Sequence, residues 1–365
     1  MLLQDVTLFH YRNYDQKKFE FPQKTTLVIG NNGQGKTNLL EAIAFFSTGQ
    51  SIRGATIDDC VQLNREYGQI SVSVLNNKEE SHLEILLSHG TIQGRKTSKV
   101  VYSINNVRKQ KRAVIGLLPT VAFLPEDLRI ITGSPARRRQ FLDEILIQID
   151  AEYSNHLDRY TQTLKRRNKV LEQIRDNNLS HNSLTFWTQG ILKHGQAIQE
   201  ARLNLVEQLN QTEFPIQFFF HYDPSVMSEE RLEKYAQAEI AVGHTLVGPQ
   251  KDDFEIKLEI RGQRSEVEIN NQSPISNLQS LASHGSRGQQ RLGVLWAKLG
   301  AFQILEKKNG YPPLLLLDDI FSELDQQHRQ MVLQLIEKTQ TIITSAEELE
   351  MLQFPELSNA TIMRL

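Results

Sequence analysis

The sequence predicts an α/β fold that is assembled from both ends of the chain and interrupted by a mainly helical lobe. Residues 25–29 form a β-rich run that is followed by a glycine-rich turn and a helical pattern, and residues 314–317 form a second buried strand that ends in two acids. Residues 136–214 contain no proline and place apolar residues at helical spacing. We expect one domain from residues 1–135 plus 215–365, and a helical lobe over residues 136–214.

Length, charge and cysteine content limit the functions that are open to the chain. It has 365 residues, and its 41 basic and 43 acidic side chains give a formal net charge of −2, which excludes a histone-like polycation. The single cysteine, Cys60, excludes an intrachain disulfide and a four-cysteine zinc site. Asp5 and His10 interrupt any apolar leader, and no aliphatic run approaches the roughly 20 residues of a membrane span. We expect a cytoplasmic protein with no membrane segment.

The first third of the chain is expected to form short strands. Residues 69–75, 82–87 and 100–104 show partial alternation of apolar and polar side chains and are bounded by polar turns. The pair Asn105-Asn106 is a plausible hairpin turn after the last of these strands.

The helical lobe is expected to begin at Ser134-Pro135, because proline is acceptable in a first helical turn. Its apolar stripes indicate two or three helices, with breaks near residues 176–183 and around residues 190–195. Beyond the lobe, residues 254–260 and 266–270 alternate like strands.

The strongest motif is a complete G-x-x-x-x-G-K-[ST] phosphate loop between the 25–29 strand and a helical run. Glycines let backbone N–H groups turn inward around phosphates, and the helix that follows directs its positive N-terminus at them. Lys36 is expected to reach the β and γ oxygens, and Thr37 to offer a hydroxyl to Mg²⁺. The loop consists of Gly30, Asn31, Asn32, Gly33, Gln34, Gly35, Lys36 and Thr37. The alternative, an ordinary glycine-rich turn, is disfavoured by the flanking strand and helix.

The buried strand over residues 314–317 ends in Asp318 and Asp319. A nucleotide-binding α/β sheet places its Mg²⁺-directed carboxylate at such a strand end. Asp318 would then hold the metal, directly or through water, and Asp319 could orient the attacking water. A strand that simply ends at a solvated turn is the alternative, and the phosphate loop makes it the weaker one.

Residues 286–290, S-R-G-Q-Q, open a helix ahead of that strand. They resemble the S-x-G-Q signature of ABC-type ATPases, in which a serine and a glycine at a helix N-terminus cap the γ-phosphate of ATP bound to the other subunit. The same residues equally describe an N-cap followed by a polar first turn. Their placement favours the signature, so we expect an ABC-type phosphate-loop ATPase head domain with an inserted helical lobe. Residues 322–325 resemble the D-loop of such ATPases.

Over essentially the whole chain the sequence resembles the RecF family of bacterial DNA replication and repair proteins, which are relatives of the structural-maintenance-of-chromosomes ATPases. Seven motifs occur in the family order, which makes the resemblance far more specific than any single motif. They are residues 9–14 (F-H-Y-R-N-Y), 30–43, 51–53 (S-I-R), the middle motif 123–128 with 133–143, 248–253 (G-P-Q-K-D-D), 286–290 and 314–325.

This resemblance implies an ATP-controlled DNA clamp. Two protomers would close head to tail, each holding ATP and Mg²⁺ between its own phosphate loop and the signature residues of the other protomer, Ser286, Gly288 and Gln289. The resemblance also adds Arg12 and Asn38 to the nucleotide contacts. It further implies action at gaps in double-stranded DNA after DNA damage, in the SOS response, with RecR and RecO as partners that help RecA to load.

The catalytic residues implied are Lys36 and Asp319. ABC-type ATPases usually carry glutamate where this chain has Asp319, whose side chain is one methylene shorter. We therefore expect a weak, DNA-stimulated ATPase. Thr344 or Ser345 stands where a switch histidine is common, so that loop is not expected to contact the γ-phosphate.

The near-neutral total charge hides a strong asymmetry. Residues 85–139 carry eleven basic and two acidic side chains, whereas residues 306–365 carry five basic and ten acidic ones. Clustered lysines and arginines would neutralise DNA phosphates and give sequence-independent, salt-sensitive binding. We expect DNA contact from a basic cluster of seven residues: Arg95, Lys96, Lys99, Arg108, Lys109, Lys111 and Arg112. We expect the basic residues 165–167 to lie on the solvent-exposed face of a helix. The arginine triplet 137–139 leaves two alternatives: it can hold phosphate, or it can pair with acids such as Asp143.

A different function remains as the alternative, that of a soluble ATPase subunit of an ABC-type transporter. It predicts a docking surface for a membrane channel and no basic groove, so the basic cluster and the helical insertion argue against it. The ten histidines show no metal-ligand spacing. The phenylalanine run 218–220 is expected to be a core strand and not a base-stacking platform.

Overall fold

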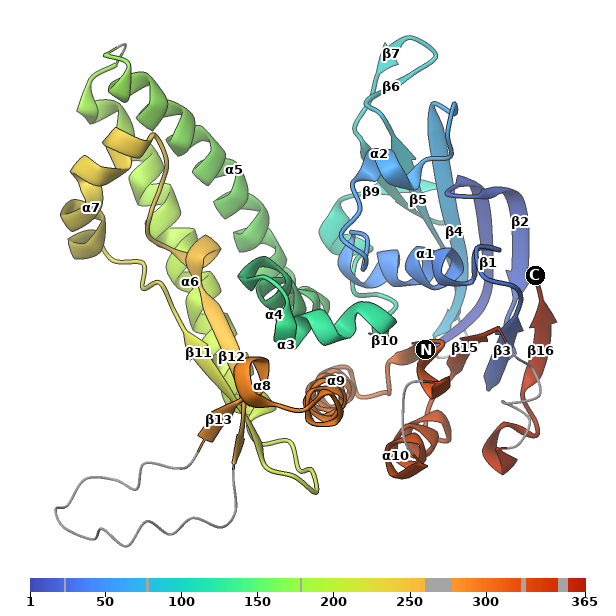
Figure 1. Cartoon of the computed structure of the whole chain (residues 1–365). Helices are drawn as coiled ribbons and strands as arrows, with labels where there is room; N and C mark the ends of the chain where they lie inside the picture. Colours follow the sequence, from blue (N-terminus) through green and yellow to red (C-terminus); the bar gives the residue numbers. More distant parts are fainter. Residues whose placement is uncertain (23, 77–78, 178, 260–277, 323–325, 347–353) are drawn as a thin grey trace, which may run out of the picture. The chain divides into compact units, whose positions relative to one another are not determined.

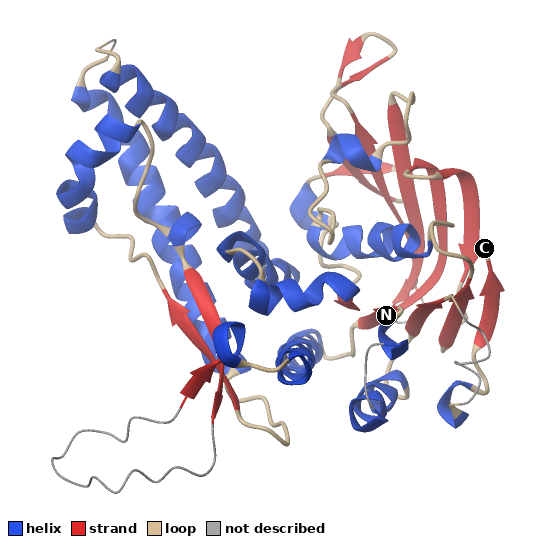
Figure 2. Cartoon of the chain, viewed as in Figure 1, coloured by secondary structure: helices blue, strands red, loops and turns tan. Residues whose placement is uncertain are grey.

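The computed structural model describes residues 1–365 apart from residues 23, 77–78, 178, 260–277, 323–325 and 347–353. The described chain divides into two compact units (Figures 1 and 2). The first contains residues 1–127, 147–149 and 301–365, and the second contains residues 128–146 and 150–300. Both units combine helices and strands, which confirms the predicted α/β class.

An antiparallel sheet of six strands, in the order β2-β1-β4-β5-β8-β9, forms one part of the first unit. The three strands predicted between residues 69 and 104 are confirmed, and so is the Asn105-Asn106 turn, where both residues adopt positive φ (50° and 64°) as a two-residue hairpin of type I′ requires. The strands are β1 (Leu2–Tyr11), β2 (Tyr14–Glu20), β4 (Tyr67–Asn76), β5 (Glu79–Ser88), β8 (Val100–Ile104) and β9 (Val107–Lys109), and β6 (Thr91–Ile92) and β7 (Arg95–Lys96) pair as a separate hairpin.

A parallel sheet of five strands, in the order β10-β14-β15-β3-β16, forms the other part of the first unit. Every residue of its three central strands is buried, as expected for a parallel sheet covered on both faces. The strands are β10 (Thr120–Phe123), β14 (Leu314–Asp318), β15 (Thr341–Ser345), β3 (Thr25–Ile29) and β16 (Thr361–Arg364). Because the strands run parallel, the loop after β3 and the acids after β14 lie at the same edge of the sheet.

Helices and helical turns complete the first unit. The helix after the phosphate loop, α1 (Lys36–Thr48), contacts β10, β14 and β15. The others are α2 (Ile57–Cys60), η1 (Lys111–Ala113), η2 (Pro125–Leu128), whose last residue belongs to the second unit, η5 (Ile320–Ser322), α10 (Gln326–Ile336) and η6 (Pro355–Leu357).

The second unit holds the predicted helical block together with a small antiparallel sheet. The block contains three long helices, α4 (Pro135–Ile149), α5 (Ala151–Arg175) and α6 (Thr185–Leu209), of which α4 ends in the first unit. The sheet has the order β11-β12-β13. The remaining elements are α3 (Arg129–Thr132), η3 (His181–Leu184), β11 (Phe218–Asp223), α7 (Glu229–Val242), η4 (Pro249–Lys251), β12 (Asp253–Glu259), β13 (Leu278–Ser280), α8 (Leu281–His284) and α9 (Arg287–Asn309), which also ends in the first unit.

One of the two predicted helix breaks is wrong. The break near residues 176–183 is confirmed, but α6 runs without interruption through residues 190–195. A Cβ atom on Gly190 would lie 2.8 Å from Thr163 Cγ2, and one on Gly195 would lie 3.1 Å from both Tyr160 and Met227. These glycines therefore serve the close packing of α6 against its neighbours, and that packing outweighs their low helix propensity.

Aromatic side chains join the small sheet to the helices of the second unit. The phenylalanine run 218–220 is confirmed as a core strand, because Phe218 and Phe220 are buried in β11. Phe220 stacks on Trp296 at 4.9 Å and on Phe141 at 6.1 Å between ring centroids. The compact unit therefore extends well beyond the predicted lobe, whose boundaries at residues 136–214 stay a prediction. The strand predicted over residues 266–270 lies outside the described residues.

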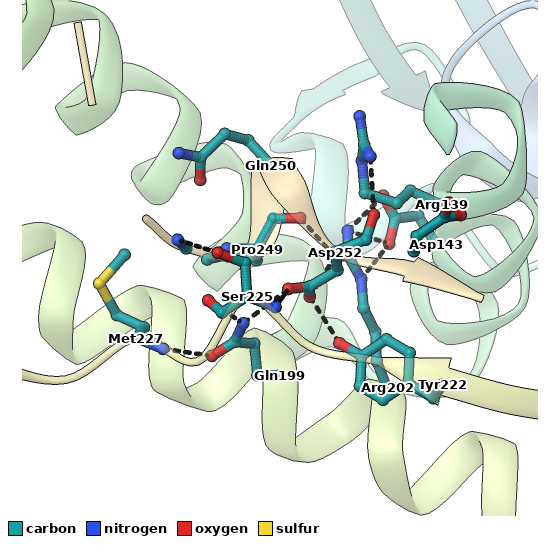
Figure 3. A network of polar contacts seen from close by, with 12 residues as sticks. Arg139, Asp143, Gln199, Arg202, Tyr222, Ser225, Met227, Pro249, Gln250 and Asp252 are labelled. Carbon is teal, nitrogen blue, oxygen red and sulfur yellow. Dashed lines mark hydrogen bonds and ion pairs between the residues drawn. The ribbon is translucent and has the colours of Figure 1, made fainter. Parts of the chain in front are cut away.

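A buried polar network ties α4, α6 and the small sheet together (Figure 3). The side chain of Arg202 on α6 is 3 % exposed, and its Nε and Nη2 donate to the carboxylate of Asp143 on α4 at 2.9–3.1 Å. Its Nη1 donates to the carbonyl of Pro249 at 2.9 Å and to Asp252 Oδ2 at 3.0 Å. Tyr222 on β11 donates to the same oxygen of Asp252. One guanidinium group thus joins α6 to α4 and to residues 249–252, and Asp252 extends the network to β11.

Replacing Arg202 is expected to destabilise the protein strongly. Arg202→Ala leaves the Asp143 and Asp252 carboxylates buried without their cation, which costs roughly 3–5 kcal/mol in the free energy of unfolding. Urea denaturation followed by circular dichroism measures the loss. The matched control is Arg166→Ala on the exposed side of α5, which should change stability by no more than about 0.5 kcal/mol. Equal stabilities for the two variants would contradict this role of Arg202.

Candidate nucleotide and DNA sites

The phosphate loop lies between the end of β3 and the start of α1, as the sequence predicts. Gly33 and Gly35 have φ values of 84° and 109°, a region that favours glycine. No side chain caps the start of α1, and its first turn contains no acid. The first N–H groups of the helix and its positive dipole end therefore remain directed at the loop, which is the arrangement of an anion site.

The side chains of the loop fold back on its own backbone. Lys36 is 7 % exposed, and its ammonium group donates to the carbonyl oxygens of Gly30 and Asn31, the latter at 3.1 Å. Gln34 Oε1 accepts a hydrogen bond of 2.6 Å from the N–H of Asn31. The cation is thus held at the start of the loop, close to the N–H groups that would contact a phosphate.

Asp318, at the end of β14, is in direct contact with the phosphate loop. Thr37 Oγ1 donates to Asp318 Oδ2 at 2.7 Å, and Thr344 Oγ1 at the end of β15 donates to Asp318 Oδ1 at 2.6 Å. A hydroxyl and a carboxylate side by side form a hard-oxygen donor set, which fits Mg²⁺. Two residues that are 281 positions apart in the sequence therefore lie in direct contact, and their part as metal ligands stays a prediction.

Asp319 follows directly in the left-handed conformation, with φ of 49°. Its N–H donates to the carbonyl of Thr344 at 3.2 Å. The predicted part of Asp319 in orienting water stays a prediction, as does the catalytic part of Lys36.

The turn between β1 and β2 braces the backbone of the phosphate loop with hydrogen bonds, which no single motif predicts. Asn13 Nδ2 donates to the carbonyl of Gln34 and Tyr14 to that of Gly35, both at 3.0 Å, and Asn38 on α1 donates to Asn13 Oδ1 at 2.8 Å. A Cβ atom on Gly35 would lie 2.7 Å from the Tyr14 hydroxyl. The available signal was the family-like segment over residues 9–14, which places this turn beside the loop. Asn38 thus contacts this turn, and its contact with the nucleotide stays a prediction.

Arg12 lies in the same turn and forms an ion pair with Glu41, a fully buried acid of α1. Its Nε and Nη2 donate to the two oxygens of Glu41 at 2.8 and 2.7 Å. Tyr11 and Ser51 also donate to this carboxylate. Burial lowers the pKa of Arg12, but the hydrogen bond and charge of Glu41 outweigh it, so the pKa is raised. The predicted nucleotide contact of Arg12 stays a prediction, and the structure gives this side chain a bracing contact as well.

The signature residues open α9 in the second unit. Gln289 N–H donates to Ser286 Oγ at 3.3 Å, and Ser286 N–H donates to Gln289 Oε1 at 2.8 Å. This reciprocal pair is a capping box, and Gly288 lies between the two residues. This geometry fits an ordinary N-cap, and it also fits an ATPase signature, because both place a serine and a glycine at a helix N-terminus. Both interpretations of the motif therefore stay open. Residues 323–325 of the D-loop-like segment lie outside the described residues.

The basic cluster lies on the first unit, along the edge strand β9 and around the β6–β7 hairpin (Figure 1). Its side chains are exposed except that of Lys111, which is half-buried. Lys99 Nζ forms an ion pair of 2.7 Å with Asp58 on α2, and His89 contacts the same carboxylate at 3.1 Å. These contacts lower the pKa of Asp58. The predicted DNA contact of the cluster is thus compatible with its exposure.

In each of the two other basic segments, at least one arginine pairs with an acid. In the triplet 137–139, Arg138 pairs with Asp253 at 2.5 Å and Arg139 donates to the carbonyl of Asp252 at 2.8 Å. The triplet therefore pairs with an acid, which is one of the two predicted alternatives, but the acid that Arg138 contacts is Asp253. Asp143 pairs with Arg202 instead. The solvated face expected for residues 165–167 is wrong for Arg167, which is buried and pairs with Glu239 at 2.7 Å.

No described helix is long and apolar enough to cross a membrane. In the same part of the chain, no group of three or more histidine, cysteine, aspartate or glutamate side chains is arranged to hold a metal ion.

Comparisons with known proteins agree along the whole chain. Residues 2–363 match the family described as RecF/RecN/SMC N terminal domain. The chain is 32 % identical to the DNA replication and repair protein RecF of Oceanobacillus iheyensis, over 99 % of both chains, and 30 % identical to that of Agathobacter rectalis, over 94 % of this chain and 92 % of the relative.

A solved structure of the recombination mediator protein RecF with ATPrS, from the RecFOR pathway, is 27 % identical and has a TM-score of 0.82, over 100 % of this chain and 95 % of that one. A second, titled RecF-ATP, also has a TM-score of 0.82, at 28 % identity over 95 % and 92 % of the two chains. The chain therefore belongs to the RecF/RecN/SMC N-terminal domain family and, within it, to the RecF proteins.

Proposed function

We propose that this chain is an ATP-controlled DNA-binding protein of DNA replication and repair. The observation that carries the proposal is the contact of Thr37 with Asp318 beside the uncapped start of α1, where hard oxygen ligands, a buried lysine and free N–H groups converge. Phosphates and their metal are the ligands that such a set recognises. The relatives named RecF, and the solved RecF structures whose titles name ATP and ATPrS, add independent support.

Each group of the site has a distinct part in this proposal. The loop N–H groups and Lys36 neutralise the β- and γ-phosphates, and Thr37 and Asp318 hold Mg²⁺. When bound, Mg²⁺ neutralises charge on the phosphate oxygens. Asp319 orients the attacking water, with a shorter reach than glutamate, so hydrolysis is slow and serves as a switch.

ATP also controls assembly in this proposal. The start of α9 in one protomer closes over the γ-phosphate that the other protomer holds, so ATP joins two copies head to tail. The supporting features are the serine and the glycine at this helix start and the absence of acids from its first turn.

DNA binds through the basic cluster. Its exposed cations contact phosphates, which gives sequence-independent binding that weakens as salt rises. Family membership supports action at gaps in duplex DNA in the cytoplasm, with RecR and RecO as partners in loading a recombinase. The transporter alternative has no observation in its favour.

Removing the loop lysine is expected to weaken nucleotide binding. Lys36→Ala deletes a charge-assisted hydrogen bond, worth about 1.5–3 kcal/mol, and should raise the Kd for Mg²⁺-ATP roughly 10- to 150-fold. Isothermal titration calorimetry measures the Kd. Lys24→Ala, on an exposed lysine just before β3, is the control and should leave the Kd unchanged. Equal ATP affinity in the Lys36 variant and the wild type would reject the assigned nucleotide site.

A bulky cation at the signature is expected to separate ATP binding from assembly. Ser286→Arg should keep the ATP affinity, because the phosphate loop is intact, and should abolish the ATP-dependent dimer. Sedimentation velocity with and without a non-hydrolysable ATP analogue measures this. Gln162→Arg adds the same side chain to an exposed position of α5 and should leave the dimer intact. An unchanged dimer in the Ser286 variant would contradict the head-to-tail arrangement.

A further inference from the structure

The short helix α2 is joined at its C-terminal end to the turn that braces the phosphate loop. The N–H of Arg12 donates to the carbonyl of Cys60 at 2.9 Å, and Tyr11 and Val61 form an antiparallel bridge. Arg12 Nη1 also donates to the carbonyl of Asp59 at 2.9 Å. Because the same turn contacts the backbone of Gln34 and Gly35, a continuous chain of hydrogen bonds joins the loop to the end of α2.

The N-terminal side of α2 is joined to the helix that follows the loop. Ser51 Oγ accepts hydrogen bonds from the N–H groups of Arg53 and Ala55, at 3.1 and 3.2 Å, and donates to Glu41 on α1. A capping box between Thr56 and Asp59 then starts α2. Both ends of α2 therefore connect to the buried Glu41–Arg12 pair.

The outer side of α2 contacts the basic cluster. Asp58 holds Lys99 at 2.7 Å and His89 at 3.1 Å. The three side chains are 44–55 % exposed, and an ion pair of this kind contributes little and exchanges easily. A DNA phosphate offers Lys99 the same anionic oxygens that the carboxylate offers, so the two anions compete for one cation.

We propose that α2 couples the nucleotide site to the DNA surface, with Arg12 as its positioning residue on the nucleotide side and Asp58 as a competitor of DNA phosphates on the other side. The proposal rests on the proposed function, because it needs both ligands. Closing the phosphate loop around a nucleotide moves the β1–β2 turn and α2 with it, and that movement withdraws Asp58 from Lys99. By linkage, DNA raises the affinity for ATP by the same factor by which ATP raises the affinity for DNA.

The test compares Asp58→Asn with Asp15→Asn in the full chain. Asp15 is the matched control, because it is also an exposed acid that pairs with one basic side chain and one histidine, Arg65 at 3.0 Å and His10 at 3.5 Å. Duplex DNA is titrated by fluorescence anisotropy with and without a non-hydrolysable ATP analogue. Without nucleotide, Asp58→Asn should raise the DNA affinity about two- to fivefold. The gain of DNA affinity on adding the analogue should shrink by the same factor, whereas Asp15→Asn should keep the wild-type gain.

The outcomes separate this proposal from the proposed function. If Asp58→Asn raises the DNA affinity equally with and without the analogue, or leaves it unchanged in both conditions, the coupling through α2 is overturned and ATP-controlled DNA binding stands. If the wild type shows no effect of the analogue on DNA affinity, the proposed function fails and the coupling fails with it.

Cys60 supplies a second readout, because the only cysteine of the chain lies in α2 and is fully buried. Burial and the nearby Glu41 carboxylate raise the pKa of its thiol to about 11, so at pH 8 the native thiol reacts slowly with iodoacetamide. The ATP analogue is expected to change the labelling rate in the wild type. In Arg12→Lys, which keeps the charge beside Glu41 but loses the fork that reaches Asp59, that response should disappear. A labelling rate that the analogue does not change in the wild type would overturn the proposal.

Discussion

The parallel order β14-β15-β3 is the constraint on which the candidate nucleotide site depends. It places the end of one strand, Asp318, beside the loop that follows another, although the two segments lie near opposite ends of the chain. Thr344, at the end of the strand between them, completes the contact by donating to Asp318. No local segment could make this arrangement alone, so the sheet has to form before the site exists. The helices inserted between β10 and β14 lengthen the connection between these two strands. They do not change how the strands pair in the sheet, so the site is unaltered.

Buried ion pairs hold segments together in both units. In the first unit Arg12 and two hydroxyls satisfy Glu41, and in the second Arg202 satisfies Asp143 and Asp252. A buried carboxylate is tolerated only when cations and hydrogen bonds replace its lost hydration. Each pair therefore fixes the segments that supply its partners. In the first unit these segments include the β1–β2 turn, which contacts the phosphate loop, and the ends of α2. The Arg12–Glu41 pair is therefore expected to affect nucleotide binding through this turn.

Signals that are local in sequence could be predicted well. The phosphate loop, the acid-ended strand and the Asn105-Asn106 turn each depend on a few neighbouring residues, and each is found where the sequence indicates. The ion pairs could not be predicted, because nothing in the spacing of Arg12 and Glu41, or of Arg202 and Asp252, shows that they meet. A lone acid within the apolar run of α1 was the only hint for Glu41. The helix break predicted at the glycines of α6 was wrong for a related reason. The low helix propensity of glycine is a local property, whereas the close packing that outweighs it involves residues distant in the sequence.

The central claim is that ATP controls the binding of DNA through phosphate contacts. The most direct test titrates duplex DNA with the full chain over a range of salt concentrations, with and without a non-hydrolysable ATP analogue. The account predicts tighter binding with the analogue, and an affinity that falls steeply with salt, by about 0.9 in log K per log unit of salt for each phosphate neutralised. An affinity that neither salt nor the analogue changes would contradict it.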